Sequence, residues 1–553
     1  MKKIIYLVSL FLILFSCKSV TEKNNNVNKS YFGDFKVEPN MELSLKSDKN
    51  WYKDAIFYHI WVKAFNDSNG DGIGDIKGIT QKLDYLKDLG INAIWLSPIF
   101  DCFYKGDNMH GYDTIDYYKV NPKFGTEEDL LELIKECHKR GIRIIFDYVV
   151  NHTSNMHPWF LDAKANGKKR NWYIWNKMPE KKNAKKKWGK PWESGGKWTT
   201  VWHKEGDSFY YGAFSRSMPD LNLRNPEVRE AMANVLVYWL NKGFDGIRID
   251  AARYIIEDGP QEAADRPETH LFFKRLRKDI LDKYDQFETS KMMVAEAWTD
   301  ANKIVPYYGD GYDEFHMCFD FPYVYSIVDI VKYGFKSSVK LNNFSNYMEF
   351  IHSIYPENAQ PATFLSNHDN AASRPMSEYK NNKKNAILAF GLNIFAKGSP
   401  FVYFGNEIGM TDAEGIKGDM RFRTPFKWEM VEEQKRDKDS IFNWYKKLID
   451  LKKSYKALRV GYYKRVDCSD PKVLAFLRYY EDEYILIVIN FKEEKADVKL
   501  NFSTMNLNLV NRKLSLILGE KDDYTKIITE DNKKEIVINN ISDTSFKIFK
   551  LEK

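Results

Sequence analysis

The sequence predicts an α/β protein built on a closed (β/α)8 barrel. From Trp51 onward, short apolar runs alternate with longer stretches whose apolar residues lie three and four positions apart. Such runs indicate buried parallel strands, and the amphipathic stretches indicate helices. Two of these stretches end at Gly141 and Gly243, and glycine commonly follows a helix. Eight strands alternating with helices favour a closed barrel over an open sheet. The eight runs are DAIFYHIWVKAF, INAIWLSPIF, IRIIFDYVV, FDGIRID, MMVAEAW, FHMCFDF, ATFLSNHD and PFVYFGNE.

Two stretches that lack this alternation of strands and helices divide the chain into domains. The interval from Asn151 to Pro226 is rich in Trp, Gly and Lys, lacks a helical period, and is far longer than an ordinary loop between strand and helix. It predicts a loop domain inserted after the third strand. After about Lys456 the apolar residues alternate, which predicts an antiparallel β-sandwich. The expected boundaries are 51–151 and 220–455 for the barrel, 152–219 for the inserted domain, and 456–553 for the C-terminal domain.

The N-terminus resembles a bacterial lipoprotein signal. MKK supplies the charged part and IIYLVSLFLILF an apolar part that is short for a transmembrane span. Ser16 precedes Cys17, which predicts a signal peptide over residues 1–17 and lipidation of Cys17. Ordinary secretion with cleavage nearby is the alternative. Residues 18–50 are polar and are expected to form a flexible tether. The protein would then be exported across the inner membrane and lipid-anchored to the bacterial envelope.

Composition narrows the partners without identifying one. The formal net charge is +7, and much of the excess lies between Lys164 and Lys190. Trp residues interrupt that basic run without a helical period, so a solvated loop surface is favoured over a patch for nucleic acid. Aromatic residues make up 15% of the chain, which suits either core packing or the stacking of sugar rings. We expect no nucleic-acid partner.

Three predicted strands lead into carboxylates. GFDGIRID ends at Asp250, VAEAW contains Glu296, and FLSNHDN contains Asp369. Because active sites of such barrels form at the C-terminal ends of the strands, we expect the three side chains on one rim. Gathered carboxylates suit acid–base and nucleophilic chemistry at an acetal carbon.

Six motifs together resemble the α-amylase family of glycoside hydrolases (family 13), in its branch between amylases and neopullulanases. In chain order they are HGYD, DYVVNH, MPDLN, GIRIDAARY, VAEAW and FLSNHD. The resemblance covers roughly Trp51 to the C-terminus, and the motifs occur in the family's order at plausible spacings. It implies a retaining enzyme that acts on an α-glucan.

The resemblance implies distinct roles for the charged residues. Asp250 would be the nucleophile, and Glu296 the general acid and then the general base. Asp369 would hold the sugar's 2- and 3-hydroxyls in a distorted ring. Arg248 lies two residues before Asp250 on the same strand face, so its charge is expected to lower the pKa of Asp250. Asp147 would hold Arg248 rather than contact the substrate.

The resemblance also implies four aromatic contacts with the same sugar. His152 and His368 would donate hydrogen bonds to it. Tyr112 would stack beneath the ring, with His110 at its edge. These four side chains and Arg248 form the expected substrate-binding set.

A loop after the first strand predicts a Ca²⁺ site. Its sequence DSNGDGIGD places oxygen-bearing side chains at alternate positions and superficially resembles an EF-hand loop, although Gly78 stands where the last ligand, Glu, would be. Many members of the family bind Ca²⁺ with this loop, and the alternative is a metal-free turn. The expected ligands are Asp67, Asn69, Asp71, the Ile73 carbonyl and Asp75.

These patterns lead to an expected activity, hydrolysis of α-1,4 bonds in starch or maltodextrins. Ala251 after the nucleophile and the MPDLN motif favour α-1,4 over α-1,6 bonds. Arg253 and Tyr254 depart from the amylase pattern at positions that usually touch the leaving sugar, which leaves neopullulanase, α-glucosidase and trehalose-synthase-like activities open. A non-catalytic glycan-binding lipoprotein is disfavoured, because such relatives tend to lose the catalytic carboxylates.

Overall fold

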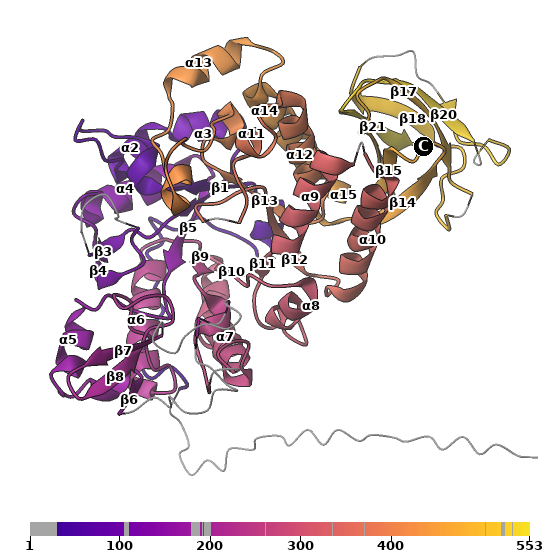
Figure 1. Ribbon diagram of the computed structural model, residues 1–553. Helices are drawn as coiled ribbons and strands as arrows, with labels where there is room; N and C mark the ends of the chain where they lie inside the picture. The colour runs from indigo at the N-terminus through magenta and orange to yellow at the C-terminus, as the bar shows by residue number, and fades with distance from the viewer. Residues whose placement is uncertain are drawn as a thin grey trace, which may run out of the picture.

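The computed structural model describes residues 30–103, 110–177, 189–190, 192, 201–259, 262–334, 336–369, 371–503, 505–520, 526–532 and 535–553. The expected signal peptide and Cys17 lie outside these residues. The described part contains a central barrel, a small inserted domain and a separate β domain at the C-terminus (Figure 1).

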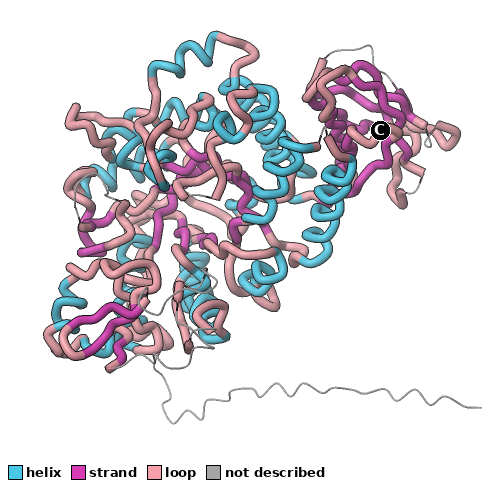
Figure 2. The backbone as a smooth tube through the Cα atoms, in the orientation of Figure 1, coloured by secondary structure: helices cyan, strands magenta, loops and turns pink. Residues whose placement is uncertain are grey.

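The predicted barrel is confirmed. Eight parallel strands close in the order β1-β13-β12-β11-β10-β9-β5-β2. In Figure 2 strands lie in the middle of this part of the molecule, with helices around them. Each of the eight apolar runs overlaps one of these strands, because a strand buried on both faces needs apolar residues throughout. Large rings fill the interior, where Phe57 stacks on Phe401 with ring centroids 4.2 Å apart. The strands are β1 Phe57–Ile60, β2 Ala93–Leu96, β5 Arg143–Tyr148, β9 Gly246–Ile249, β10 Met292–Ala295, β11 Met317–Phe319, β12 Gln360–Phe364 and β13 Ser399–Tyr403.

Helices surround the barrel, and their ends follow local sequence signals. Helix α4 begins with a capping box between Thr126 and Asp129. Gly141 and Gly243, just beyond α4 and α6, have φ angles of 68° and 112°, which glycine adopts without strain. No described helix is long and apolar enough to cross a membrane. The helices are α1 Val62–Phe65, α2 Ile76–Gln81, α3 Leu83–Leu89, α4 Glu127–Lys139, α5 Pro158–Lys164, α6 Pro226–Asn241, α7 Pro267–Asp279, α8 Ala301–Ile304, α9 Phe321–Tyr333, α10 Ser338–Ile354, α11 Pro375–Glu378, α12 Lys383–Phe395, α13 Glu429–Arg436, α14 Ile441–Ser454 and α15 Lys456–Val460.

The inserted domain follows β5, as expected. It contains α5 and an antiparallel sheet ordered β6-β8-β7. Basic and Trp side chains of this domain pair with each other in cation–π contacts. The Arg170 guanidinium lies 3.2 Å from the Trp175 ring centroid, and the Lys169 ammonium lies 3.3 Å from the Trp172 ring centroid. A two-stranded sheet, β3 with β4, precedes α4. These strands are β3 Phe100–Cys102, β4 Thr114–Val120, β6 Trp175–Asn176, β7 Trp202–Glu205 and β8 Ser208–Tyr211.

The C-terminal domain is antiparallel, as the alternating pattern predicts. Its strands are ordered β19-β18-β21-β16-β15-β14-β17-β20 and enclose a core of their own. The domain packs against the barrel helices, where Phe546 meets Phe395 edge to face at 5.4 Å. The strands are β14 Tyr462–Cys468, β15 Val473–Tyr480, β16 Glu483–Asn490, β17 Ala496–Asn501, β18 Lys513–Leu518, β19 Lys526–Ile527, β20 Ile536–Ile541 and β21 Ser545–Glu552.

The described part of the expected tether, residues 30–50, is not free of the barrel, so that expectation is wrong for this stretch. Phe32 is fully buried and meets Phe272 of α7 edge to face at 5.3 Å. The Asn40 amide donates to the Asn241 carbonyl at 2.7 Å. One buried aromatic ring is enough to hold a polar segment on the surface, because its burial contributes about 1.5–3 kcal/mol.

Candidate active site

A cavity of about 550 Å³ opens at the C-terminal rim of the barrel, within the range of small-molecule sites. Asp250 follows β9, Glu296 follows β10 and Asp369 follows β12, and all three line this cavity. The structure thus brings the three predicted carboxylates together. The full lining is His110, Tyr112, His152, Trp192, Phe214, Met218, Asp250, Ala251, Tyr254, Glu296, Trp298, Asp369, Asp419 and Arg423.

Arg248 connects the carboxylates beneath the cavity. Its Nη1 donates to Asp147 Oδ1 at 2.6 Å and to Asp250 Oδ1 at 2.8 Å. Its Nη2 lies 2.6 Å from Glu296 Oε2. The guanidinium is almost fully buried, and these charge-assisted contacts set the positions of both cavity carboxylates. Asp147 holds Arg248, as expected.

Burial has the largest effect on the pKa values of Asp147, Asp250 and Glu296. It raises the pKa of Asp147 to about 6, raises the pKa of Asp250 well above its usual range, and raises the pKa of Glu296. Arg248 lowers the pKa of all three, but one cation does not offset the burial of three mutually repelling carboxylates. Arg248 lowers the pKa of Asp250 as expected, but burial outweighs this effect, so the net pKa is raised. Burial therefore favours retention of a proton within the cluster.

A left-handed residue turns the backbone toward the general-acid candidate. Ala251 has φ 51° and follows directly after Asp250. Its N–H donates to Glu296 Oε2 at 3.1 Å. A non-glycine residue in this conformation costs of order 1 kcal/mol, and such strain gathers at functional sites. Here it gives Glu296 a fixed donor in addition to Arg248.

Arg423, which the sequence did not single out, holds the third carboxylate. Its Nη2 donates to Asp369 Oδ1 at 2.9 Å and lies 3.6 Å from Asp419. Its guanidinium also lies 4.4 Å from the Trp61 ring centroid. Arg423 follows a short 3₁₀ turn in a loop beyond β13, where no strand-end pattern marks it.

Three of the four expected aromatic sugar contacts line the cavity. Burial lowers the pKa of His110 to about 4 and that of His152 to about 3, so both rings are neutral near pH 7. His152 Nδ1 meets Asn151 Oδ1 at 2.9 Å, and its Nε2 has no partner among the described residues. That nitrogen is free to bond a sugar hydroxyl. Tyr112 donates to Asp147 Oδ2 at 3.1 Å, which fixes the plane of its ring.

His368 is placed differently from the expectation. It is fully buried, is not part of the cavity lining, and stacks behind Tyr112 with ring centroids 5.5 Å apart. Its Nε2 meets the Tyr112 hydroxyl. In this arrangement His368 positions Tyr112 and does not present a donor to the sugar.

Aromatic side chains wall the cavity. Trp192 and Phe214 come from the inserted domain, with ring centroids 4.9 Å apart, and Tyr254 lies beside Trp192 at 5.4 Å. Trp298 also lines the cavity, stacks on Phe321 at 4.7 Å and 8°, and is 36% exposed. Such faces suit the apolar C–H surface of sugar rings. Phe214 and Trp298 were missed because one isolated ring in a loop carries no periodic signal.

Comparison with known proteins agrees with this geometry. The chain matches the α-amylase catalytic domain over residues 59–461 and the C-terminal domain of maltogenic amylase over residues 463–520. The chain belongs to the α-amylase family of glycoside hydrolases. It is 33% identical to α-amylase 3 of Dictyoglomus thermophilum over 86% of this chain and 92% of that protein. It is 34% identical to the trehalose synthase/amylase of Mycolicibacterium smegmatis over 79% of this chain and 82% of that protein. The crystal structure of α-amylase from H. orenii matches with a TM-score of 0.74 at 30% identity, over 91% of this chain and all of that one.

The predicted Ca²⁺ loop of this α-amylase family member forms a series of tight turns. Asp67 accepts from the backbone of Gly70 at 2.7 Å and of Gly72 at 2.8 Å. Asp75 accepts from Ser68 and, at 2.6 Å, from the Gly78 N–H at the start of α2. No group of three or more acidic, His or Cys side chains converges as metal ligands would in the described part of the chain. The chemistry of the donor set still suits Ca²⁺, because carboxylate, amide and carbonyl oxygens are the ligands that Ca²⁺ prefers. Ca²⁺ binding stays a prediction.

Proposed function

We propose that this enzyme hydrolyses α-1,4-glucosidic bonds of starch and maltodextrins with retention of configuration, through a covalent glycosyl-enzyme. One observation carries the proposal. Asp250 and Glu296 face the same cavity and are bound to the two terminal nitrogens of one guanidinium, Arg248. That shared contact keeps the two carboxyl groups close, and retaining glycosidases need a separation of about 5–5.5 Å rather than the larger gap of inverting ones.

The proposed mechanism requires a division of labour between the two carboxyls. The Arg248–Asp147–Asp250–Glu296 cluster has one cation and three acids, so one retained proton leaves it with net charge −1. With that proton on Glu296, Asp250 is ionised and attacks the anomeric carbon while Glu296 protonates the departing oxygen. Glu296 then removes a proton from the water that releases the sugar.

The remaining side chains would grip the sugar. Arg423 binds Asp369 at the cavity, and the Asp369 side chain would accept from two ring hydroxyls. His152 Nδ1 donates to Asn151 Oδ1, so its unprotonated Nε2 would accept from a third hydroxyl, and the Tyr112 ring would cover one face. These hydrogen bonds would strengthen as the sugar ring flattens in the transition state. They would therefore lower the activation barrier and not only the KM.

A second candidate is the isomerisation of maltose, favoured by two observations. One relative is named trehalose synthase/amylase. In this chain Trp192, Phe214 and Tyr254 form an aromatic wall over the cavity. A wall that retains the released sugar and excludes water would favour its reattachment over hydrolysis.

Product analysis separates these activities. The enzyme is incubated with starch, pullulan, isomaltose and maltose, and the anomeric form of the first product is followed by NMR. The proposal expects α-anomeric maltooligosaccharides from starch. Trehalose from maltose would favour the second candidate, and release of glucose from isomaltose alone would refute the α-1,4 assignment.

Glu296→Gln tests whether the protein is catalytic at all. We expect starch hydrolysis to fall by about 10²–10⁴-fold, the usual contribution of a general acid–base residue. Glu349→Gln, on the exposed face of α10, is the matched control and should keep the wild-type rate. Equal rates in both variants would favour a glycan-binding protein.

A further inference from the structure

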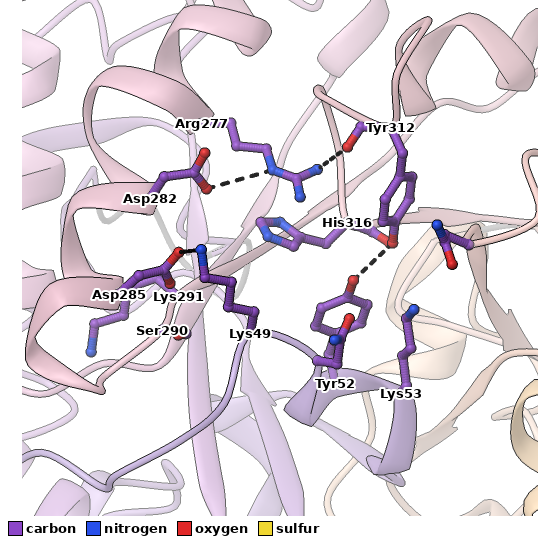
Figure 3. Close-up of a pocket in the computed structure, with 12 residues that line it drawn as sticks. Lys49, Tyr52, Lys53, Arg277, Asp282, Asp285, Ser290, Lys291, Tyr312 and His316 are labelled. Carbon is purple, nitrogen blue, oxygen red and sulfur yellow. Dashed lines mark hydrogen bonds and ion pairs between the residues drawn. The ribbon is translucent and has the colours of Figure 1, made fainter.

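A second polar cavity lies at the opposite end of the barrel from the active site (Figure 3). Its volume is about 300 Å³. Lys291 and His316 stand directly before β10 and β11, and Tyr52 lies in the turn before β1. The lining therefore comes from the N-terminal ends of the strands, which the proposed chemistry does not use.

His316 directs an unused donor into this cavity. Its ring is only 4% exposed, and its Nδ1 accepts from the Met293 N–H at 3.2 Å. That bond leaves the proton on Nε2, which has no partner among the described residues. Figure 3 shows the imidazole in the middle of the lining side chains. This donor is open to the cavity and is available to an acceptor bound there.

Cations around His316 are only partly neutralised. Arg277 uses Nη1 to bond the Tyr312 and Glu314 carbonyls, and its Nε lies 3.7 Å from Asp282. Its Nη2 has no hydrogen-bond partner in the described structure. Lys53 is half-buried, and its ammonium makes no ion pair with any described residue. Burial lowers its pKa by more than the neighbouring Asp54 raises it.

The charge balance of the lining fits a dianion. Four cations line the cavity, Lys49, Lys53, Arg277 and Lys291, against two carboxylates, Asp282 and Asp285, which leaves an excess of +2. One carboxylate is already engaged, since Asp285 pairs with Lys49 at 2.8 Å. Burial lowers the pKa of Lys291 to about 8, and its ammonium has no carboxylate within ion-pair distance in the described chain.

We propose that this cavity binds a tetrahedral dianion, either inorganic phosphate or the phosphoryl group of a small phosphomonoester. His316 Nε2, Arg277 Nη2 and the Lys53 ammonium would donate to its oxygens. The cavity volume lies at the lower end of the range for organic ligands, about 300–1,000 Å³, so it admits a phosphomonoester as well as the free ion. Occupation would relieve the repulsion among the cations and hold the starts of β1, β10 and β11 together.

The test compares anions at equal ionic strength on the full chain. Thermal unfolding is followed in sodium chloride, phosphate, sulfate and glycerol 3-phosphate, and affinity is measured by isothermal titration on the folded protein. We expect phosphate to raise the Tm in a saturable way that chloride does not reproduce. Phosphate alone would identify the free ion as the occupant, and tighter binding of glycerol 3-phosphate would identify a phosphomonoester.

Two variants assign the effect to this cavity. Lys53→Met removes one charge, and His316→Asn keeps an acceptor near the Met293 N–H while deleting the donor. Each should raise the Kd for phosphate by at least about tenfold, the effect of losing one charge-assisted hydrogen bond. Lys464→Met, on the exposed face of β14, is the charge-matched control and should bind as wild type does. Equal Tm shifts in phosphate and chloride, or an unchanged Kd in both cavity variants, would overturn the proposal.

Discussion

Replacing Arg248 with lysine should separate the charge of this residue from its geometry. The guanidinium makes contacts of 2.6 and 2.8 Å through Nη1 and one of 2.6 Å through Nη2. A lysine ammonium is a single point of charge and cannot span the positions of Asp250 and Glu296 at once. At least one bond to a charged group, worth about 1.5–3 kcal/mol, is lost. If that bond positions the reacting carboxyl, kcat falls roughly 10- to 150-fold.

The assay is steady-state hydrolysis of a maltooligosaccharide by Arg248→Lys across pH. Because Arg248 lowers the pKa of Asp250, weakening their contact raises that pKa, and the acid limb of kcat/KM should move to higher pH. Arg478→Lys provides the matched control, since Arg478 is a fully buried arginine of the C-terminal domain that bonds backbone carbonyls. A kcat within twofold of wild type together with an unmoved acid limb would refute the reasoning, provided that thermal unfolding shows both variants folded.

Three further predictions concern stability and location. If the loop at Asp71 binds Ca²⁺, a chelator should lower the Tm of the wild type but not that of Asp71→Ala. Ca²⁺ at 100 times its Kd should add about 2.7 kcal/mol to the free energy of unfolding. Equal responses of the two proteins to chelator would exclude the site. Burial alone would raise the pKa of Asp245, but His138 and Arg143 hold this pKa below its usual range. The contribution of Asp245 to the stability of the fold is therefore present above about pH 4 and is lost as the pH falls through the folded-state pKa. Urea unfolding should show Asp245→Asn less stable by about 1–3 kcal/mol at pH 7 and less sensitive to acid than wild type, and parallel pH profiles would contradict this. Cys17→Ala should abolish incorporation of labelled lipid and move the protein to the soluble fraction, whereas unchanged labelling would disprove the anchor.

The barrel could be predicted because its signal is local and repeated. Each buried strand requires a run of apolar residues, and each covering helix requires apolar residues on one face. The three carboxylates followed from the same rule, because parallel strands bring their C-terminal ends to one rim. Asp250, Glu296 and Asp369 were therefore predictable as neighbours although they lie far apart along the chain.

The errors arose where a contact depends on distant residues. Residues 30–50 look like a tether because they are polar, but the ring of Phe32 is buried against Phe272 of α7. Arg423 holds Asp369 from a loop with no pattern of its own. The pKa of Asp250 depends on how much water the folded rim excludes, which Arg248 alone does not reveal.

The sequence by itself determined the barrel, the order of its strands along the chain and the carboxylates at their ends, since these follow from periodicity and from the parallel arrangement. Only the tertiary structure decided which side chains reach the cavity. His368 lies behind Tyr112, Arg423 binds Asp369, and Trp298 lines the cavity together with residues of the inserted domain. The physical reason is that the direction and burial of a side chain are set by packing between elements that are distant in sequence. A pattern along the chain shows only which face of its own helix or strand a residue lies on.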